Sequence, residues 1–62
     1  MDYKQYIKDQ LEPHPFGKDM DAIARRLPED GEYDELESAL VELSRRGDIK
    51  QFGNKWRWMR FD

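Results

Sequence analysis

Residues 39–59 read ALVELSRRGDIKQFGNKWRWM. The first half places Leu40 and Leu43 at helical spacing and ends in two arginines and Gly47, which is typical of a helix C-terminus. The second half has two short runs on either side of Gly53-Asn54, a pair that suits a two-residue β-turn. This stretch therefore predicts a helix that leads directly into a β-hairpin over residues 49–60.

A turn at Gly53-Asn54 also predicts the register of the hairpin. The expected cross-strand pairs are Phe52 with Lys55, Gln51 with Trp56, Lys50 with Arg57, and Ile49 with Trp58. Side chains alternate between the two faces of a strand. The face expected to pack on the helices therefore holds Ile49, Gln51, Trp56 and Trp58. The opposite face is basic, is expected to meet solvent, and holds Lys50, Phe52, Lys55 and Arg57.

Three helices are predicted before the hairpin, over residues 3–12, 19–27 and 33–46. In each, apolar side chains recur at spacings of three and four residues, so that they share one face. Asp2 and Asp19 are the expected N-caps of the first two helices. Asp30 or Gly31 is the expected cap of the third, after the turn that begins at Pro28.

Length and composition exclude several classes of protein. The chain has 62 residues, enough for a single domain over residues 1–62, and 40% of them are charged. It has no cysteine, which excludes disulfide frameworks, cysteine-ligated zinc or iron–sulfur sites and thiol catalysis. No apolar run has the length of a membrane span or of a signal peptide. We expect a small, acidic α+β protein of the cytoplasm.

Charge is unevenly distributed along the chain. Residues 1–43 hold 5 basic and 12 acidic side chains, whereas residues 44–62 hold 6 basic and 2 acidic ones. Such asymmetry indicates a surface for a charged partner. Two other interpretations remain open, namely that the basic hairpin neutralises the acidic helices of its own chain, and that its cations protect an edge strand from aggregation.

Two stretches resemble the winged helix-turn-helix superfamily. Residues 19–24, DMDAIA, are similar to the cap and first turns of the second helix of that family, and residues 39–49 are similar to its third helix running into the wing. The resemblance covers roughly residues 5–60 and implies three helices followed by a two-stranded wing. It also implies a role in transcription regulation, DNA or RNA binding, or protein docking, and the fold alone does not choose among these.

The resemblance implies that the exposed face of the third helix enters the DNA major groove. The corresponding positions here are Asp34, Glu35, Glu37, Ser38, Val41, Glu42 and Arg45. Carboxylates at these positions are repelled by phosphate, which favours the wing and the end of the third helix instead. The nucleic-acid contacts predicted on this basis are Arg45, Arg46, Lys50, Phe52, Asn54, Lys55, Arg57 and Arg60.

The alternative hypothesis is a protein-interaction module without nucleic-acid binding. Its acidic third helix would dock on a basic partner, or on the basic wing of a second copy of the chain. The residues predicted to carry this interaction are Asp34, Glu35, Ser38, Val41 and Glu42.

Catalytic, metal and cofactor sites are not expected. His14 has no second histidine or cysteine to share a metal ion, and the carboxylates of residues 29–35 lack the spacing of a calcium loop. A chain of this size offers no evident cleft in which carboxylates can be desolvated for catalysis. Trp56 and Trp58 are expected in the core, with base stacking as the alternative.

Overall fold

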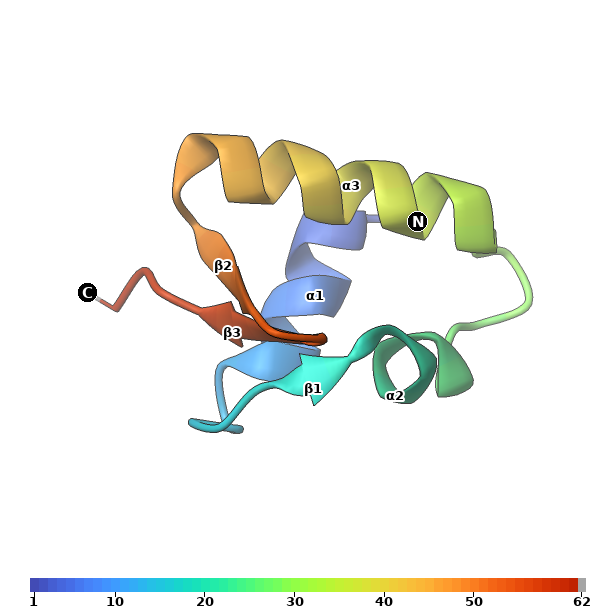
Figure 1. Ribbon diagram of the computed structural model, residues 1–62. Coiled ribbons are helices and arrows are strands. Elements are labelled where there is room, and N and C mark those ends of the chain that lie inside the picture. The colour runs from blue at the N-terminus through green and yellow to red at the C-terminus, as the bar shows by residue number, and fades with distance from the viewer. Residues whose placement is uncertain (62) are drawn as a thin grey trace.

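The computed structural model describes residues 1–61. Its elements are α1 (Tyr3–Leu11), β1 (Lys18–Asp19), α2 (Met20–Arg25), α3 (Tyr33–Arg46), β2 (Ile49–Phe52) and β3 (Lys55–Trp58). The three helices and a three-stranded antiparallel sheet of order β1-β3-β2 make an α+β fold, with α3 crossing α1 (Figure 1). Every helix in residues 1–61 is too short or too polar to span a membrane.

The hairpin has the register predicted from its turn. Ile49 is opposite Trp58, Lys50 opposite Arg57, Gln51 opposite Trp56, and Phe52 opposite Lys55. Gly53 has a φ of +64°, the left-handed conformation that the two-residue turn requires.

The prediction of a two-stranded sheet is wrong, because β1 pairs with β3. Lys18 is opposite Trp56 and Asp19 is opposite Lys55. Gly17 allows this approach: it has a φ of +80°, and a Cβ atom there would lie 2.4 Å from the carbonyl oxygen of Trp56. A strand of two residues has no alternation to detect in the sequence, so only the pairing itself defines it.

The predicted caps are confirmed for α1 and α2. The amide of Gln5 donates to Asp2 Oδ1 at 3.1 Å, and the amide of Ala22 donates to Asp19 Oδ1 at 2.8 Å. The prediction for α3 is wrong, since its N-cap is Glu32, whose side chain makes no capping hydrogen bond.

The predicted helix boundaries hold for α3 and are too long elsewhere. α1 ends at Leu11 rather than at residue 12, and α2 ends at Arg25 rather than at residue 27. Leu27 precedes Pro28, and a proline disfavours helical backbone in the residue before it. The hairpin likewise ends at Trp58, two residues before its predicted limit.

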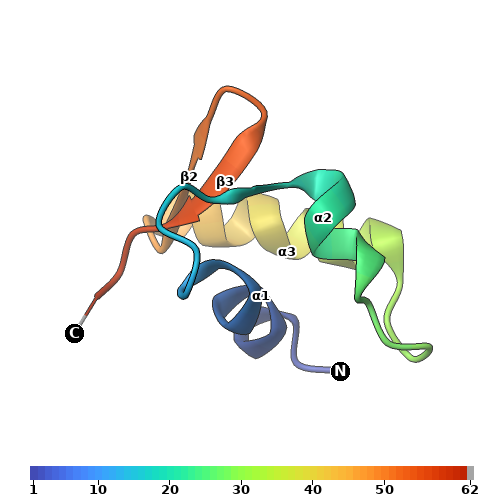
Figure 2. The ribbon, with the colours of Figure 1, turned by 90° about the horizontal axis from the view of Figure 1, so that it is seen from below.

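The core lies where the three helices meet the base of the hairpin. Its buried apolar residues are Ile7, Leu11, Ile23, Leu36, Leu40, Leu43, Ile49 and Trp58. Trp56 is half-buried and packs against this cluster. Gln51, predicted to pack on the helices, is exposed, because the hairpin extends away from the helices toward its tip (Figure 2).

Candidate functional site

The outer face of the hairpin brings together four of the predicted contact residues. We define the hairpin face as Lys50, Phe52, Lys55 and Arg57. Lys50, Phe52 and Lys55 are exposed. Arg57 is half-buried beside Gly17. The guanidinium carbon of Arg57 lies 4.9 Å from the centroid of the Phe52 ring, and Lys50 Nζ lies 5.4 Å from it. Both distances are within the range of cation–π interactions, so the two cations are gathered around one aromatic ring.

Among residues 1–61, the cations of the hairpin face are not paired with carboxylates. Within residues 1–61, ion pairs of 4.0 Å or less join Lys4 to Asp48, Lys8 to Glu12, and Arg60 to Asp48. None of them involves Lys50, Lys55 or Arg57. Direct pairing with the acidic helices therefore does not account for the basic character of this face.

Arg60 has a different environment from the hairpin face. Its Nε lies 2.5 Å from Oδ1 of Asp48, a carboxylate that is only 4% exposed. Lys4 Nζ lies 3.9 Å from the other carboxylate oxygen, and the amide of Met59 donates to the Asp48 carbonyl oxygen at 2.9 Å. Arg60 therefore neutralises a buried charge and ties residues 59–60 to the start of β2.

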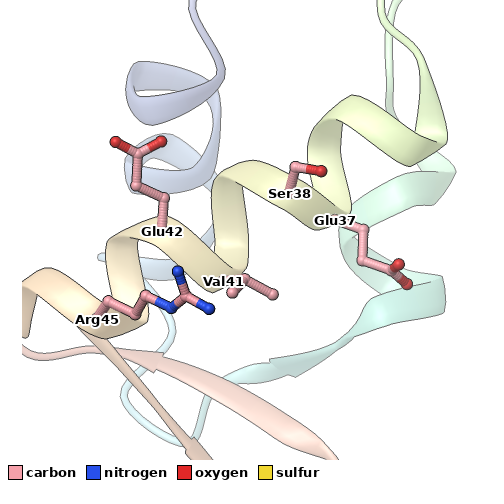
Figure 3. A pocket seen from close by; sticks show the side chains of 5 residues that line it. All are labelled: Glu37, Ser38, Val41, Glu42 and Arg45. Atoms are coloured by element: carbon pink, nitrogen blue, oxygen red, sulfur yellow. The ribbon is translucent and has the colours of Figure 1, made fainter.

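The arginines at the end of α3 do not join the hairpin face either. Arg46 lines a surface pocket with Lys4, Asp48 and Arg60. Arg45 lies on the exposed face of α3, where its side chain extends toward Val41 (Figure 3). Asn54 is exposed in the turn at the tip of the hairpin. The predicted nucleic-acid contacts are thus divided among the hairpin, the surroundings of Asp48 (Arg46 and Arg60) and the surface of α3 (Arg45).

The exposed face of α3 carries a shallow groove of mixed character. The side chains that line it are Glu37, Ser38, Val41, Glu42 and Arg45 (Figure 3). Val41 is 42% exposed, as its position off the apolar stripe predicts. The groove therefore presents one apolar side chain, that of Val41, bordered by two carboxylates and one guanidinium.

A second shallow groove lies where the start of α3 meets α1. Asp34 and Glu35 line it together with Tyr3, whose hydroxyl donates to Glu35 Oε1 at 2.8 Å. The same hydroxyl accepts a hydrogen bond from the amide of Glu32 at 2.9 Å. Glu35 therefore has a structural role in fastening α1 to α3 as well as adding negative charge.

Sequence reasoning did not find the role of Asp48. A carboxylate after a helix-ending glycine is an ordinary surface residue in the sequence pattern, and its burial depends on Lys4 and Arg60 from the two ends of the chain. The only local signal is that Asp48 immediately precedes the buried strand residue Ile49.

No family model matches the chain, and no curated protein or solved structure shows significant similarity to it.

Proposed function

We propose that the chain is a small winged-helix protein that binds nucleic acid through its hairpin face. The observation that carries this proposal is the set of three cations on the hairpin face, Lys50, Lys55 and Arg57, none of which is paired with a carboxylate of residues 1–61. Two of them, Lys50 and Arg57, lie over the ring of exposed Phe52. Such a surface attracts the phosphate backbone of a nucleic acid, because binding releases the counterions condensed on this polyanion.

The order of the elements supports the winged-helix assignment. α3 follows α2 and is followed directly by the hairpin, and α1 packs against α3 (Figure 1). Strand β1 is added at the β3 edge of the sheet and leaves β2 at the other edge. A hairpin that directly follows the third helix and keeps one edge unpaired within residues 1–61 supports the proposal that it acts as a wing.

Charge favours the hairpin over α3 as the contact surface. The exposed side of α3 carries Asp34, Glu35, Glu37 and Glu42, each of which phosphate repels. On the hairpin, exposed Gln51 and Asn54 add uncharged hydrogen-bonding groups beside the cations. The proposed mechanism is electrostatic attachment by the hairpin face, with a small number of contacts from Phe52, Gln51 and Asn54.

Charge reversal on the hairpin tests this proposal. The double variant Lys55→Glu/Arg57→Glu is expected to abolish binding to a fluorescent mixed-sequence oligonucleotide at low salt, measured by anisotropy. Glu37→Ala, on the exposed side of α3, is expected to bind as well as the wild type or better. A matched control is Arg25→Glu/Arg26→Glu, which makes the same change in net charge at two exposed residues, the last of α2 and the one after it. Unchanged binding by the hairpin variant, with a dispersed NMR spectrum, would refute the assignment.

The groove on α3 favours a second candidate function, docking of a basic protein partner. An exposed Val41 between Glu37 and Glu42 suits an apolar side chain flanked by cations. The two candidates differ in the sign of the surface that retains the chain. Nucleic-acid binding predicts retention on heparin. Docking through α3 predicts retention on a polybasic matrix, and the variant Glu37→Lys/Glu42→Lys is expected to lose this retention.

A further inference from the structure

The hairpin face also points to a class of nucleic acid. Resting on the proposed function, we infer that the ligand is single-stranded and that one unpaired base stacks on Phe52. The inference is based on the position of Phe52 in the sheet, the cations around its ring, and the charge of α3.

Phe52 is placed where a flat ligand can reach it. It is the last residue of β2, which is an edge strand in the order β1-β3-β2. The side chain is 42% exposed although cations lie near the ring. Beyond it, no atom other than those of Phe52, Gly53 and Asn54 themselves lies within 4 Å of the position of a Cβ at Gly53. Within residues 1–61, no further strand pairs with the β2 edge beside the ring.

The cations around Phe52 suit a nucleotide better than a phosphate alone. Arg57 and Lys50 lie 4.9 Å and 5.4 Å from the centroid of the ring. A phosphate bound by either cation therefore has its own base within reach of the ring. Stacking of bases on aromatic side chains, with cations along the backbone, is how proteins bind single strands with little sequence preference.

A duplex fits this surface less well. Its bases are stacked on one another, so that contact with the face of the Phe52 ring requires a base step to be opened. In addition, in the duplex arrangement that the resemblance implies, α3 enters the groove, and its exposed Glu37 and Glu42 would repel the phosphates there. A single strand needs only the hairpin face, and the four residues of β2 extend for about 13 Å.

The experiment compares four probes with the wild type and with Phe52→Leu. The probes are a DNA strand of about 12 nucleotides, the RNA strand of the same sequence, the DNA duplex, and an abasic strand of equal length and charge. We expect the wild type to bind both single strands more tightly than the duplex. Phe52→Leu is expected to lose roughly tenfold in affinity for the base-containing strands and to bind the abasic strand like the wild type.

Two further variants separate stacking from damage to the fold. Phe52→Tyr keeps an aromatic ring and is expected to retain wild-type affinity. Phe16→Leu makes the same substitution as Phe52→Leu at a phenylalanine that is 83% exposed and lies outside the hairpin, and it is expected to change nothing. The NMR spectrum of each variant shows whether it is folded.

The outcomes distinguish the inference from the proposed function. If the wild type binds none of the probes at low salt, the proposed function fails. If it binds duplex and single strand equally and Phe52→Leu has no effect, the inference is wrong and the proposed function stands. An equal loss for the abasic strand also overturns the inference, because the ring would then act only by positioning cations. Comparison of the affinities for the DNA and RNA strands shows which of the two nucleic acids the protein prefers.

Discussion

Tyr6 joins α1 to α2 through a single hydrogen bond. Its hydroxyl donates to the carbonyl oxygen of Ile23, and burial raises the pKa of Tyr6 above its ordinary value of 10.0, against the opposing effect of the Arg26 charge. Because the folded state favours the protonated phenol, this contribution to stability is fully present below pH 10.0 and is lost as the pH rises through the raised pKa.

The corresponding prediction concerns Tyr6→Phe. At neutral pH the variant is expected to be less stable than the wild type by about 1 kcal/mol, the net contribution of one hydrogen bond. Above the raised pKa of Tyr6 the difference is expected to shrink, because a phenolate cannot donate. Urea unfolding of both proteins at the two pH values measures this, with Tyr33→Phe, at an exposed tyrosine, as the control. A difference that is independent of pH would contradict the assigned hydrogen bond.

The elements β1 and α3 each depend on a glycine with positive φ, and the two glycines differ in their surroundings. Gly17, before β1, has a φ of +80°, and a Cβ atom there would meet the Trp56 carbonyl oxygen. Gly47, which ends α3, has a φ of +83°, and a Cβ atom there would have no neighbour within 4 Å. Substitution of the two glycines therefore separates backbone strain from the close approach of β1 to β3.

We predict that Gly17→Ala destabilises the fold more than Gly47→Ala does. Gly47→Ala is expected to cost about 1 kcal/mol, the penalty of left-handed backbone for an L-residue. Gly17→Ala has the same penalty and must also move β1 away from β3. Urea unfolding gives the two free energies, and amide exchange in β1 and β3 reports on the pairing. Equal losses would mean that the β1–β3 contact contributes little to stability.

The molecule as a whole separates the negative charge of residues 1–43, which hold 5 basic and 12 acidic side chains, from the positive charge of its hairpin. The net charge is −3, so attraction to nucleic acid depends on local cations and not on the total. Of these, Lys50, Lys55 and Arg57 form the hairpin face, while Arg45 and Arg46 lie elsewhere.

This arrangement predicts the salt dependence of binding. Three phosphate contacts on a single strand correspond to a slope of about −2 for the logarithm of the binding constant against the logarithm of salt concentration. Participation of Arg45 and Arg46 as well would make the slope about −3.5. Anisotropy titrations over a range of salt concentrations measure it. A slope near zero would mean that ionic contacts with phosphate do not hold the complex.

Features that depend on near neighbours in the chain could be predicted from the sequence. Helix α3 has its predicted limits because the leucine spacing and Gly47 are both local signals. The hairpin register follows from the turn at Gly53-Asn54. The same register and the alternation of side chains were sufficient to predict the grouping of Lys50, Phe52, Lys55 and Arg57.

Features that depend on residues far apart in the chain became evident only in the folded molecule. Strand β1 exists because Lys18 and Asp19 meet β3, and two residues are too few to show a period. Gln51 is exposed because no helix lies under the distal part of the hairpin, which alternation along a strand cannot reveal. Arg60 pairs with buried Asp48, and not with the hairpin face, because residues after Trp58 leave the strand and its alternation no longer applies.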